Sequence, residues 1–278
     1  MPRNAPKTLK PVRPNAGIEI AYRKKIDALV KAMHASLTYW LTAAYRANEP
    51  ELLAHDAPPD ASGGTPIQRS PAMALRERMR QLTRQWQKRF DDASLDLAKY
   101  FATAVTERND AALRSILKRS GFTVQFKLTR AMNDVLQATV GENVSLIKSI
   151  ASQHLTQVEG LVMRSVTAGR DLESLAKELQ EQFGVTKRRA ARISLDQNNK
   201  ATAALTRVRY VELGIKTAKW RHSGGGKEPR PSHVKASREG VTYNIDEGWL
   251  DPAIGKRIWP GSEINCRCVS IPIVAGFS

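Results

Sequence analysis

The sequence predicts an α+β fold that is predominantly α-helical, with long N-terminal helices, a further helical segment and a small C-terminal domain that contains a sheet. Two observations lead to this prediction. Over most of the chain, apolar residues recur at steps of three and four, the period of one helix face. After Gly214 the chain becomes rich in Gly and Pro, and short stretches alternate apolar and polar residues, as strands do. The 278 residues have room for one large domain or two ordinary ones.

The N-terminal region, residues 17–130, is predicted to hold two long helices. Residues 1–16 precede it and should form a disordered basic tail, because four prolines forbid a helix there. The apolar stripe predicts helices over 18–48 and 72–120. Between them, near 49–71, repeated Pro and Gly indicate a mobile linker.

The segment 122–130 is predicted to be a strand. Val124, Phe126 and Leu128 alternate there with polar residues, which is the period of a half-buried strand. The alternative is a loop that merely alternates. Gly121, just before it, suits the end of the preceding helix, where a left-handed residue is needed.

The second region, residues 131–278, is predicted to begin with helix 133–168, interrupted near Gly141 and stopped by Gly169. Asp171 should open a short helix, because an acidic residue is favoured at the positive end of the helix dipole.

This short helix is predicted to end at Gly184. Thr186 is then an N-cap candidate for a very basic helix that reaches Leu213 and stops at Gly214.

From about residue 215 onward we expect a small sheet with long loops. Strand-like alternation appears over 215–222, and a turn with a short strand over 240–244. Residues 223–232 are a Gly- and Pro-rich loop. Pro260-Gly261 is a turn, and a final short strand covers 268–274.

The charge balance predicts a polyanionic or acidic partner. The chain has 44 Lys and Arg against 27 Asp and Glu, a net charge of +17. The alternative is that the excess is spread over solvated helix faces. The DNA-contact candidates lie on the basic helix and are Lys187, Arg188, Arg189, Arg192, Lys200, Arg207 and Arg209. We find no targeting signal and no run long enough to span a membrane, and we expect a soluble protein in a reducing compartment.

The metal-ligating candidates are His222, His233, Cys266 and Cys268, which together could satisfy a tetrahedral zinc. The Cys-x-Cys spacing is shorter than the usual knuckle, so the favoured interpretation is that the cysteines are small packed residues, that His233 is a loop residue and that no cofactor is bound. Asn265 beside the histidines also resembles a His-Asn-His nuclease, but the surrounding sequence does not predict the helix such a site needs.

No other catalytic pattern is present, so we expect the protein not to be an enzyme. Gly224-Gly225-Gly226-Lys227 lacks the spacing of a phosphate-binding loop. Asp246, Glu247 and Asp251 read as exposed loop carboxylates. Their expected partners are basic side chains, by bidentate pairing in the case of arginine. The partner candidates are Arg230, Arg238, Lys256 and Arg267.

The order of the C-terminal motifs resembles the phage Mu F-like, or SPP1 gp7-like, head morphogenesis family. The resemblance covers about 140–275: an Arg- and Ala-rich helix, then Gly214, a Trp-bearing strand, Arg230-Pro231-Ser232-His233 and a terminal Asn-Cys-Arg-Cys. It implies that 131–278 is a head morphogenesis domain. The structural motif residues carried over are Trp220, Arg230, His233, Gly240, Asn265, Cys266, Arg267 and Cys268.

The resemblance implies a minor structural protein of a tailed double-stranded DNA phage head. Such a protein is associated with the portal and the procapsid interior and acts in head assembly and DNA packaging or ejection. Its expected partners are the portal protein, other head proteins and double-stranded DNA without sequence preference. We expect it in the virion, inside the head, and in the host cytoplasm during assembly, as an oligomer that follows portal symmetry.

The chain departs from its relatives where many of them carry an aspartate or a Cys-x-x-Cys after the Trp. The resemblance implies that such a cysteine pair joins the terminal Cys-x-Cys in a zinc site; here His222 begins the corresponding stretch. A metal-dependent DNA-binding or DNA-processing factor therefore stays as the alternative function. Fusions of this domain to toxin enzymes also exist, but with Ser278 so close to the domain we expect none here.

Overall fold

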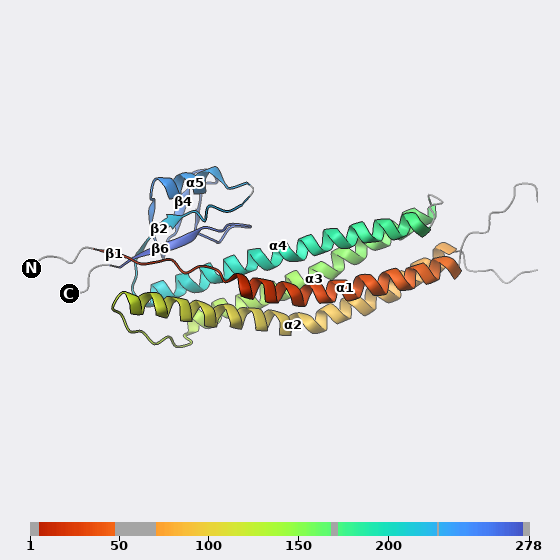
Figure 1. Cartoon of the computed structure of the whole chain (residues 1–278), viewed down its shortest axis with the longest axis horizontal. Helices are drawn as coiled ribbons and strands as arrows, with labels where there is room; N and C mark the ends of the chain where they lie inside the picture. The colour runs from red at the N-terminus through yellow and green to blue at the C-terminus, as the bar shows by residue number, and fades with distance from the viewer. Residues whose placement is uncertain (1–5, 48–70, 168–171, 227, 275–278) are drawn as a thin grey trace, which may run out of the picture. The chain divides into compact units, whose positions relative to one another are not determined.

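The computed structural model describes residues 6–47, 71–167, 172–226 and 228–274. Four long helices come first: α1 (Ala16–Ala47), α2 (Pro71–Arg119), α3 (Arg130–Thr167) and α4 (Leu172–Glu212). Six short strands and a fifth helix make up the rest of the described chain (Figure 1). The α+β, predominantly α prediction is therefore confirmed, as are the two long helices before residue 120.

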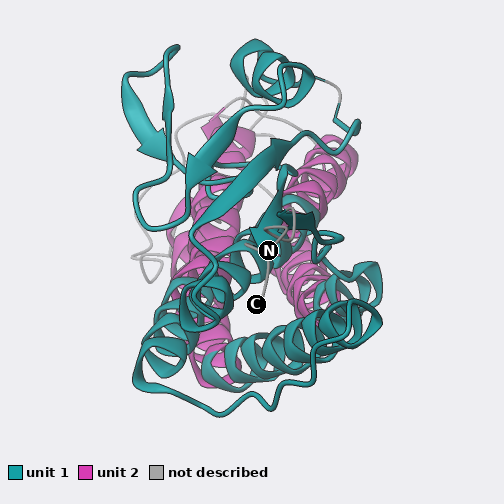
Figure 2. Cartoon of the chain, turned by 90° about the vertical axis from the view of Figure 1, so that its left-hand side faces the viewer, with its two compact units in different colours: residues 1–24, 95–144, 191–278 teal, residues 25–94, 145–190 magenta. Residues whose placement is uncertain are grey.

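The chain divides into two compact units (Figure 2). Unit 1 comprises Met1–Lys24, Leu95–Val144 and Ala191–Ser278, and unit 2 comprises Lys25–Ser94 and Ser145–Ala190. Each of the four long helices contributes residues to both units. The predicted boundary at 130/131 is thus not the boundary of either unit.

Unit 2 consists of helix segments that bury apolar stripes. Ile26, Met33 and Leu37 of α1 are fully buried, as the three- and four-residue spacing predicts. Leu75, Met79 and Phe90 of α2 occupy the same interior. Its polar contacts include His34, whose ring stacks on Phe183 and whose Nε2 lies 3.1 Å from Gln180 Oε1.

The helical part of unit 1 has a more polar interior. Tyr22 stacks on Phe101 and donates a 2.9 Å hydrogen bond to Asn143 Oδ1. The Asn143 amide in turn donates to Gln197 Oε1 at 2.9 Å. Arg209 is 2% exposed and forms ion pairs with Asp110 at 2.7 Å and with Glu212 at 2.8 Å.

The sheet of unit 1 has four antiparallel strands in the order β1-β6-β2-β3. Its strands are β1 (Lys7–Thr8), β2 (Thr217–Arg221), β3 (Thr242–Asn244) and β6 (Val269–Val274). A separate hairpin pairs β4 (Trp249–Asp251) with β5 (Lys256–Ile258), and α5 (Pro231–Arg238) lies between β2 and β3 in sequence. The predicted strands over 215–222, 240–244 and 268–274 are thus confirmed. Buried side chains from the last turns of α2 and from β2, β3 and β6 share one core cluster.

The N-terminal tail is a correction to the prediction of disorder over 1–16. Lys7 and Thr8 pair with β6, and Leu9 and Val12 are only 3% and 5% exposed. The prolines do exclude a helix, but extended backbone can add to a sheet edge and bury alternate side chains. Residues 1–5 lie outside the described residues, and so does nearly all of the predicted linker near 49–71.

The segment 122–130 is not a strand, which is a second correction. Residues 122–129 have no regular secondary structure, and Arg130 begins α3. Phe122, Val124 and Phe126 pack partly against the core cluster, whereas Leu128 is 65% exposed. The alternation of apolar and polar residues reflects the burial of one side of the segment. Such burial does not require the segment to pair with a strand.

The helix breaks predicted at Gly141 and Gly184 are a third correction. α3 continues through Gly141, and α4 continues through Gly184 and Thr186. A helical glycine costs about 1 kcal/mol relative to alanine, which the packing of a long helix overcomes. Thr186 is no N-cap: its hydroxyl donates to Gln182 O inside the helix. The helix end predicted at Gly169 and the helix start predicted at Asp171 lie outside the described residues. Among the residues that the structure describes, no helix is long and apolar enough to cross a membrane.

Candidate metal centre

The helix α5 positions His233, which the sequence had placed in a loop. Pro231 starts this helix, where a missing N–H costs nothing, and Arg230 before it is extended. His233 and Ala236 face inward on one side, and Gly240, at φ +65°, follows the helix end. Pro231 was the signal in the sequence. It was interpreted as part of an irregular loop, but proline also favours the first position of a helix.

The segment before β6 positions the two cysteines. Gly261, at φ +86°, makes a turn so close to α4 that a Cβ there would lie 2.8 Å from the Ala203 Cβ. Asn265 is left-handed at φ +59°, and its N–H donates to the Asp196 carboxylate of α4. Cys266 and Cys268 then follow with both sulfurs toward α5.

The resulting cluster brings together His233, Cys266 and Cys268. Nδ1 of His233 lies 3.5 Å from the Sγ of Cys266 and 3.7 Å from the Sγ of Cys268. The three possible ligand atoms lie within 4.8 Å of one another, and no residue of the cluster is more than 4% exposed. Neither cysteine forms a disulfide.

The other nitrogen of the same ring faces Asp251, a residue that the sequence analysis placed on an exposed loop. Nε2 of His233 lies 3.5 Å from Asp251 Oδ2, and Asp251 is only 1% exposed. Ser232 Oγ donates to Oδ2 at 3.0 Å, and the N–H of Ala253 donates to Oδ1 at 2.9 Å. The β4–β5 hairpin, not anticipated from sequence, is what carries this carboxylate inward.

Two tryptophans enclose the imidazole. The rings of Trp220 and His233 meet edge to face at 4.8 Å between centroids, and Trp249 packs at 4.8 Å from Trp220. Large apolar walls lower the local dielectric, which strengthens electrostatic interactions within the cluster.

The two thiols differ in acidity. Hydrogen bonding from the Cys268 thiol and from His233 lowers the pKa of Cys266, outweighing the opposing effect of burial. The pKa of Cys268 is raised, because that thiol donates to Cys266 and is itself buried. A thiolate is the form that binds metal ions and acts as a nucleophile. Chemically, the cluster can therefore hold a soft cation or act as a thiol pair.

The remaining motif residues surround this cluster without joining it. His222, predicted as a fourth ligand, is outside: its Nδ1 accepts from the N–H of Gly224 at 3.0 Å. Arg230 donates to Ile264 O at 3.1 Å. Arg267 has no carboxylate partner within the described ranges, so the expected pairing there is wrong. The exposed carboxylates pair elsewhere, Asp246 with Lys216 and Glu247 with Arg257.

The seven DNA-contact candidates divide by burial. Lys187, Arg188 and Arg192 are exposed, whereas Arg189 is partly buried and donates to Ser149 Oγ at 3.0 Å. Arg209 is a correction: its guanidinium is held by two carboxylates and by Lys127 O and cannot reach a phosphate.

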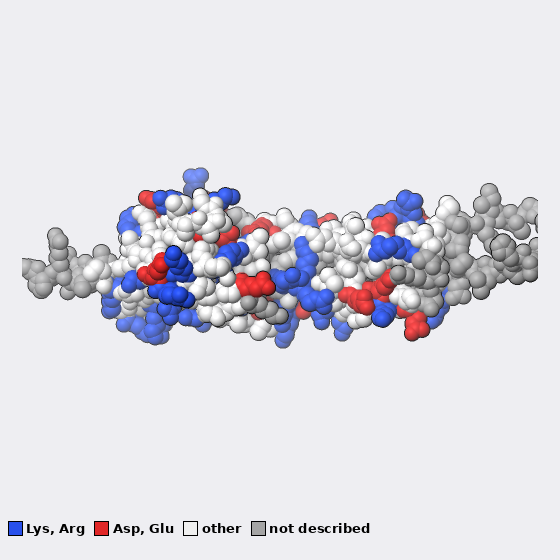
Figure 3. Space-filling model, turned by 90° about the horizontal axis from the view of Figure 1, so that it is seen from above, with Lys and Arg blue, Asp and Glu red and all other residues white. Residues whose placement is uncertain are grey.

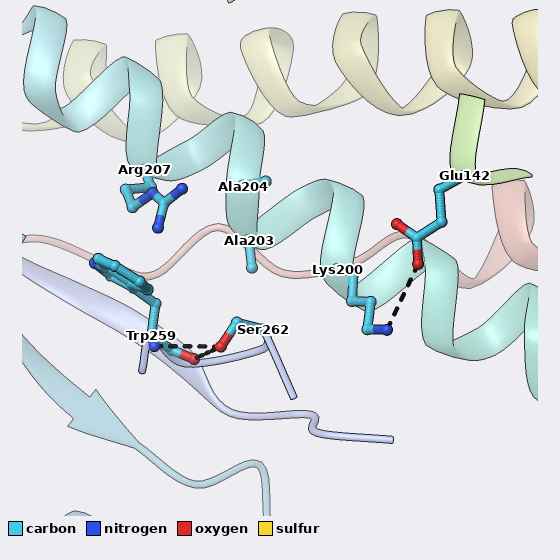
Figure 4. A pocket seen from close by; sticks show the side chains of 7 residues that line it. All are labelled: Glu142, Lys200, Ala203, Ala204, Arg207, Trp259 and Ser262. Atoms are coloured by element: carbon cyan, nitrogen blue, oxygen red, sulfur yellow. Dashed lines mark hydrogen bonds and ion pairs between the residues drawn. The ribbon is translucent and has the colours of Figure 1, made fainter. Parts of the chain in front are cut away.

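Lys200 and Arg207 line a pocket of about 240 Å³ in unit 1 (Figure 4). Lys200 Nζ lies 3.0 Å from Asp196 and 3.7 Å from Glu142. The Arg207 guanidinium stacks over the Trp259 ring at 4.2 Å, and burial lowers its pKa. On the face drawn in Figure 3, Lys and Arg side chains form several separate groups interspersed with Asp and Glu.

Comparison with known proteins supports the resemblance found in the motifs. Residues 156–271 match the family model described as Phage Mu protein F like protein. An uncharacterized protein of Haemophilus influenzae is 28% identical over 95% of this chain and 55% of its own length. The uncharacterized protein YqbB of Bacillus subtilis is 24% identical over 42% of this chain and 41% of its own length. The chain thus spans about half the length of the curated relatives it matches, and no solved structure matches it.

Proposed function

We propose that this chain, whose residues 156–271 match the family model described as Phage Mu protein F like protein, is a minor structural protein of a tailed double-stranded DNA phage head. The match is the observation on which the proposal rests. It covers the end of α3, all of the described part of α4, and the C-terminal strands almost to their end, and so includes every residue of the Cys/His cluster. The family supports a role in head morphogenesis and a place in the virion.

The finer role we propose is association with the portal and the procapsid interior, in head assembly and DNA packaging or ejection. Exposed large apolar side chains support a protein partner: in unit 2, Tyr39 is 65% and Trp40 is 41% exposed. The protein would join the portal in the host cytoplasm and take its oligomeric state from portal symmetry. Co-expression tests this: we expect a stable complex of the chain with its own portal protein. A chain that stays apart from portal and procapsid at every stage of assembly would contradict the role.

We further propose non-specific contact with packaged DNA, supported by the net charge of +17 and by the exposed cations of α4. The affinity should fall steeply with salt and ignore sequence. Lys187→Ala should reduce the slope of log affinity against log salt by about 0.9, the value for one phosphate contact. Lys88→Ala, which removes an exposed lysine paired with Asp92, is the matched control and should leave the slope unchanged. A flat salt dependence would assign the charge to a protein partner.

A second candidate function is a metal-dependent DNA-processing factor, and the convergence of His233, Cys266 and Cys268 is the observation that favours it. We propose the non-enzymatic role as the better supported one, because two thiols and one imidazole, all buried, leave little access for a DNA strand. Incubating plasmid DNA with the protein and Mg²⁺ or Mn²⁺ separates the two. Cleavage that His233→Ala abolishes would establish the enzymatic alternative.

A further inference from the structure

We propose that Nδ1 of His233 and the sulfurs of Cys266 and Cys268 bind one Zn²⁺ ion. This inference is independent of the head-protein role, since a metal centre can stabilise a domain of any function. It also differs from the ligand set suggested by sequence, because His222 is excluded and Asp251 becomes a supporting residue.

The first argument is the spacing of the ligand atoms. With Zn–S near 2.3 Å and Zn–N near 2.0 Å, a tetrahedral ion separates a sulfur ligand from a nitrogen ligand by about 3.6 Å. The two Sγ–Nδ1 distances are 3.5 and 3.7 Å. The atoms therefore already stand at two edges of a zinc tetrahedron.

The second argument is that one ring nitrogen faces two sulfurs. Nδ1 carries a single proton or a single lone pair, so it can make one well-directed hydrogen bond. A single hydrogen bond made by Nδ1 accounts for its contact with only one of the two sulfurs. Nearly equal distances to Cys266 and Cys268 are the arrangement expected when all three atoms point to one shared centre.

The third argument is the support behind the imidazole. A metal-bound histidine usually donates its other N–H to a carboxylate, which fixes the tautomer and the ring orientation. Asp251 Oδ2 lies 3.5 Å from Nε2 and is itself held by Ser232 and by the N–H of Ala253. Nε2 forms no hydrogen bond among the described residues, so Asp251 is the nearby carboxylate that a small movement of the ring would bring into hydrogen-bond range. A proton on Nε2 would face this carboxylate and leave Nδ1 free to coordinate.

Charge and ligand chemistry select the ion. Two thiolates balance the two charges of Zn²⁺, so the ion and its two sulfur ligands carry no net charge in a buried site. Thiolate and imidazole ligands suit zinc, whereas Mg²⁺ and Ca²⁺ prefer oxygen. Within the described ranges no fourth His, Cys, Asp or Glu joins the group, so one coordination position is left for a water or for a ligand from a partner.

Metal analysis of the purified full-length protein tests the proposal. We expect about one zinc per chain in the wild type and in His222→Gln, the control that removes a partly buried histidine outside the cluster. His233→Gln, Cys266→Ser and Cys268→Ser should each lower the zinc content severalfold. Asp251→Asn should keep the zinc but weaken its affinity about 10- to 100-fold in chelator competition. Co²⁺ added to chelator-treated wild type should give the thiolate charge-transfer absorption of a tetrahedral site, a readout that needs no variant.

Three results would overturn the proposal. One is wild-type protein that neither carries zinc nor gives the Co²⁺ spectrum after the cysteines are shown to be reduced. Another is a stable Cys266–Cys268 disulfide in protein isolated under anaerobic conditions. The third is retention of stoichiometric zinc by His233→Gln with loss in His222→Gln.

Discussion

The two compact units differ in what they bury. Unit 2 has an apolar interior, and its buried polar side chains among the described residues are only Ser94, His154, Ser165 and Thr186. All other buried polar or charged side chains that the structure describes lie in unit 1. These include Asn143, Gln197, Arg209, His233 and Asp251, which are joined by hydrogen bonds or ion pairs.

The difference indicates which unit depends more on exact side-chain positions. Apolar helix faces tolerate volume-conserving exchange and fix a packing only broadly. A connected buried polar network is satisfied in one arrangement, and a missing member leaves the others unpaired at high cost. Unit 1 contains the sheet and the Cys/His cluster, whose positions depend on such an arrangement.

The largest expected effect is on the ion-pair network of unit 1. Arg209→Ala leaves Asp110 and Glu212 partly buried without their cation and should lower the free energy of unfolding by about 3–5 kcal/mol. Arg108→Ala, an exposed arginine of α2 in the same unit, should change it by less than about 0.5 kcal/mol. Equal urea midpoints for the two variants would show that the ion pairs of Arg209 do not stabilise unit 1.

Cavity formation tests the apolar interior of unit 2. Met33 is fully buried, so Met33→Ala should cost about 2–5 kcal/mol in urea unfolding. Met33→Leu nearly conserves the volume and should cost less than about 1.5 kcal/mol. If both substitutions are equally costly, unit 2 depends on detailed complementarity as much as unit 1 does.

His154 sharpens the comparison, because among the described residues of unit 2 it is the one buried histidine. Its Nδ1 lies 2.8 Å from Thr186 Oγ1, whose proton goes to Gln182 O, so Nδ1 is the donor. Nε2 is buried without a hydrogen-bond partner among the described residues. Burial, and secondarily the charge of His34, lower the pKa of His154 from 6.5 to about 4.

Stability should therefore decline as the pH falls. Above pH 6.5 His154 is neutral in both states; between 6.5 and about 4 only the unfolded chain takes up the proton, and below about 4 the loss is complete. The loss from this residue should approach about 3 kcal/mol. The free energy of unfolding of His154→Phe, measured across this range, should fall less steeply than that of the wild type. Parallel pH profiles would contradict the assignment.

The smallest effect is expected at a surface ion pair of unit 2. Lys88 Nζ lies 3.0 Å from Asp92, one turn along α2, and both side chains are largely exposed. Lys88→Ala should change the free energy of unfolding by about 0.5 kcal/mol or less. A larger change would mean that surface charge contributes to unit 2 more than its apolar interior suggests.

The periodicity of the sequence predicted the long helices because their apolar stripes are what they bury. It also predicted β2, β3 and β6, and the alternation over 215–222 gave the clear period of a strand, whereas β4 and β5 were not predicted. The helix breaks predicted at Gly141 and Gly184 were wrong. Local propensity does not include tertiary packing, which keeps a long helix intact at a glycine. The β1 pairing depends on residues more than 260 positions apart, which no local pattern records.

For the candidate site, the residue types were predictable and their partners were not. His233, Cys266 and Cys268 stood out as chemistry-bearing residues, yet His222 looked equally eligible. Only the fold separates the two histidines, by placing one on the buried face of α5 and the other beside Gly224. Asp251 was read as exposed because its neighbours are polar or turn-forming, whereas the β4–β5 hairpin turns its carboxylate inward.

The central claim is that this chain is a minor component of a phage head, and its copy number in particles tests that claim most directly. Heads from a phage that encodes it should be purified, freed of tails and treated with nuclease, and the chain quantified by mass spectrometry against the portal protein. We predict that it is retained in a few copies per head, comparable to the portal. Its absence from purified heads, or a copy number like that of the major capsid protein, would contradict the account.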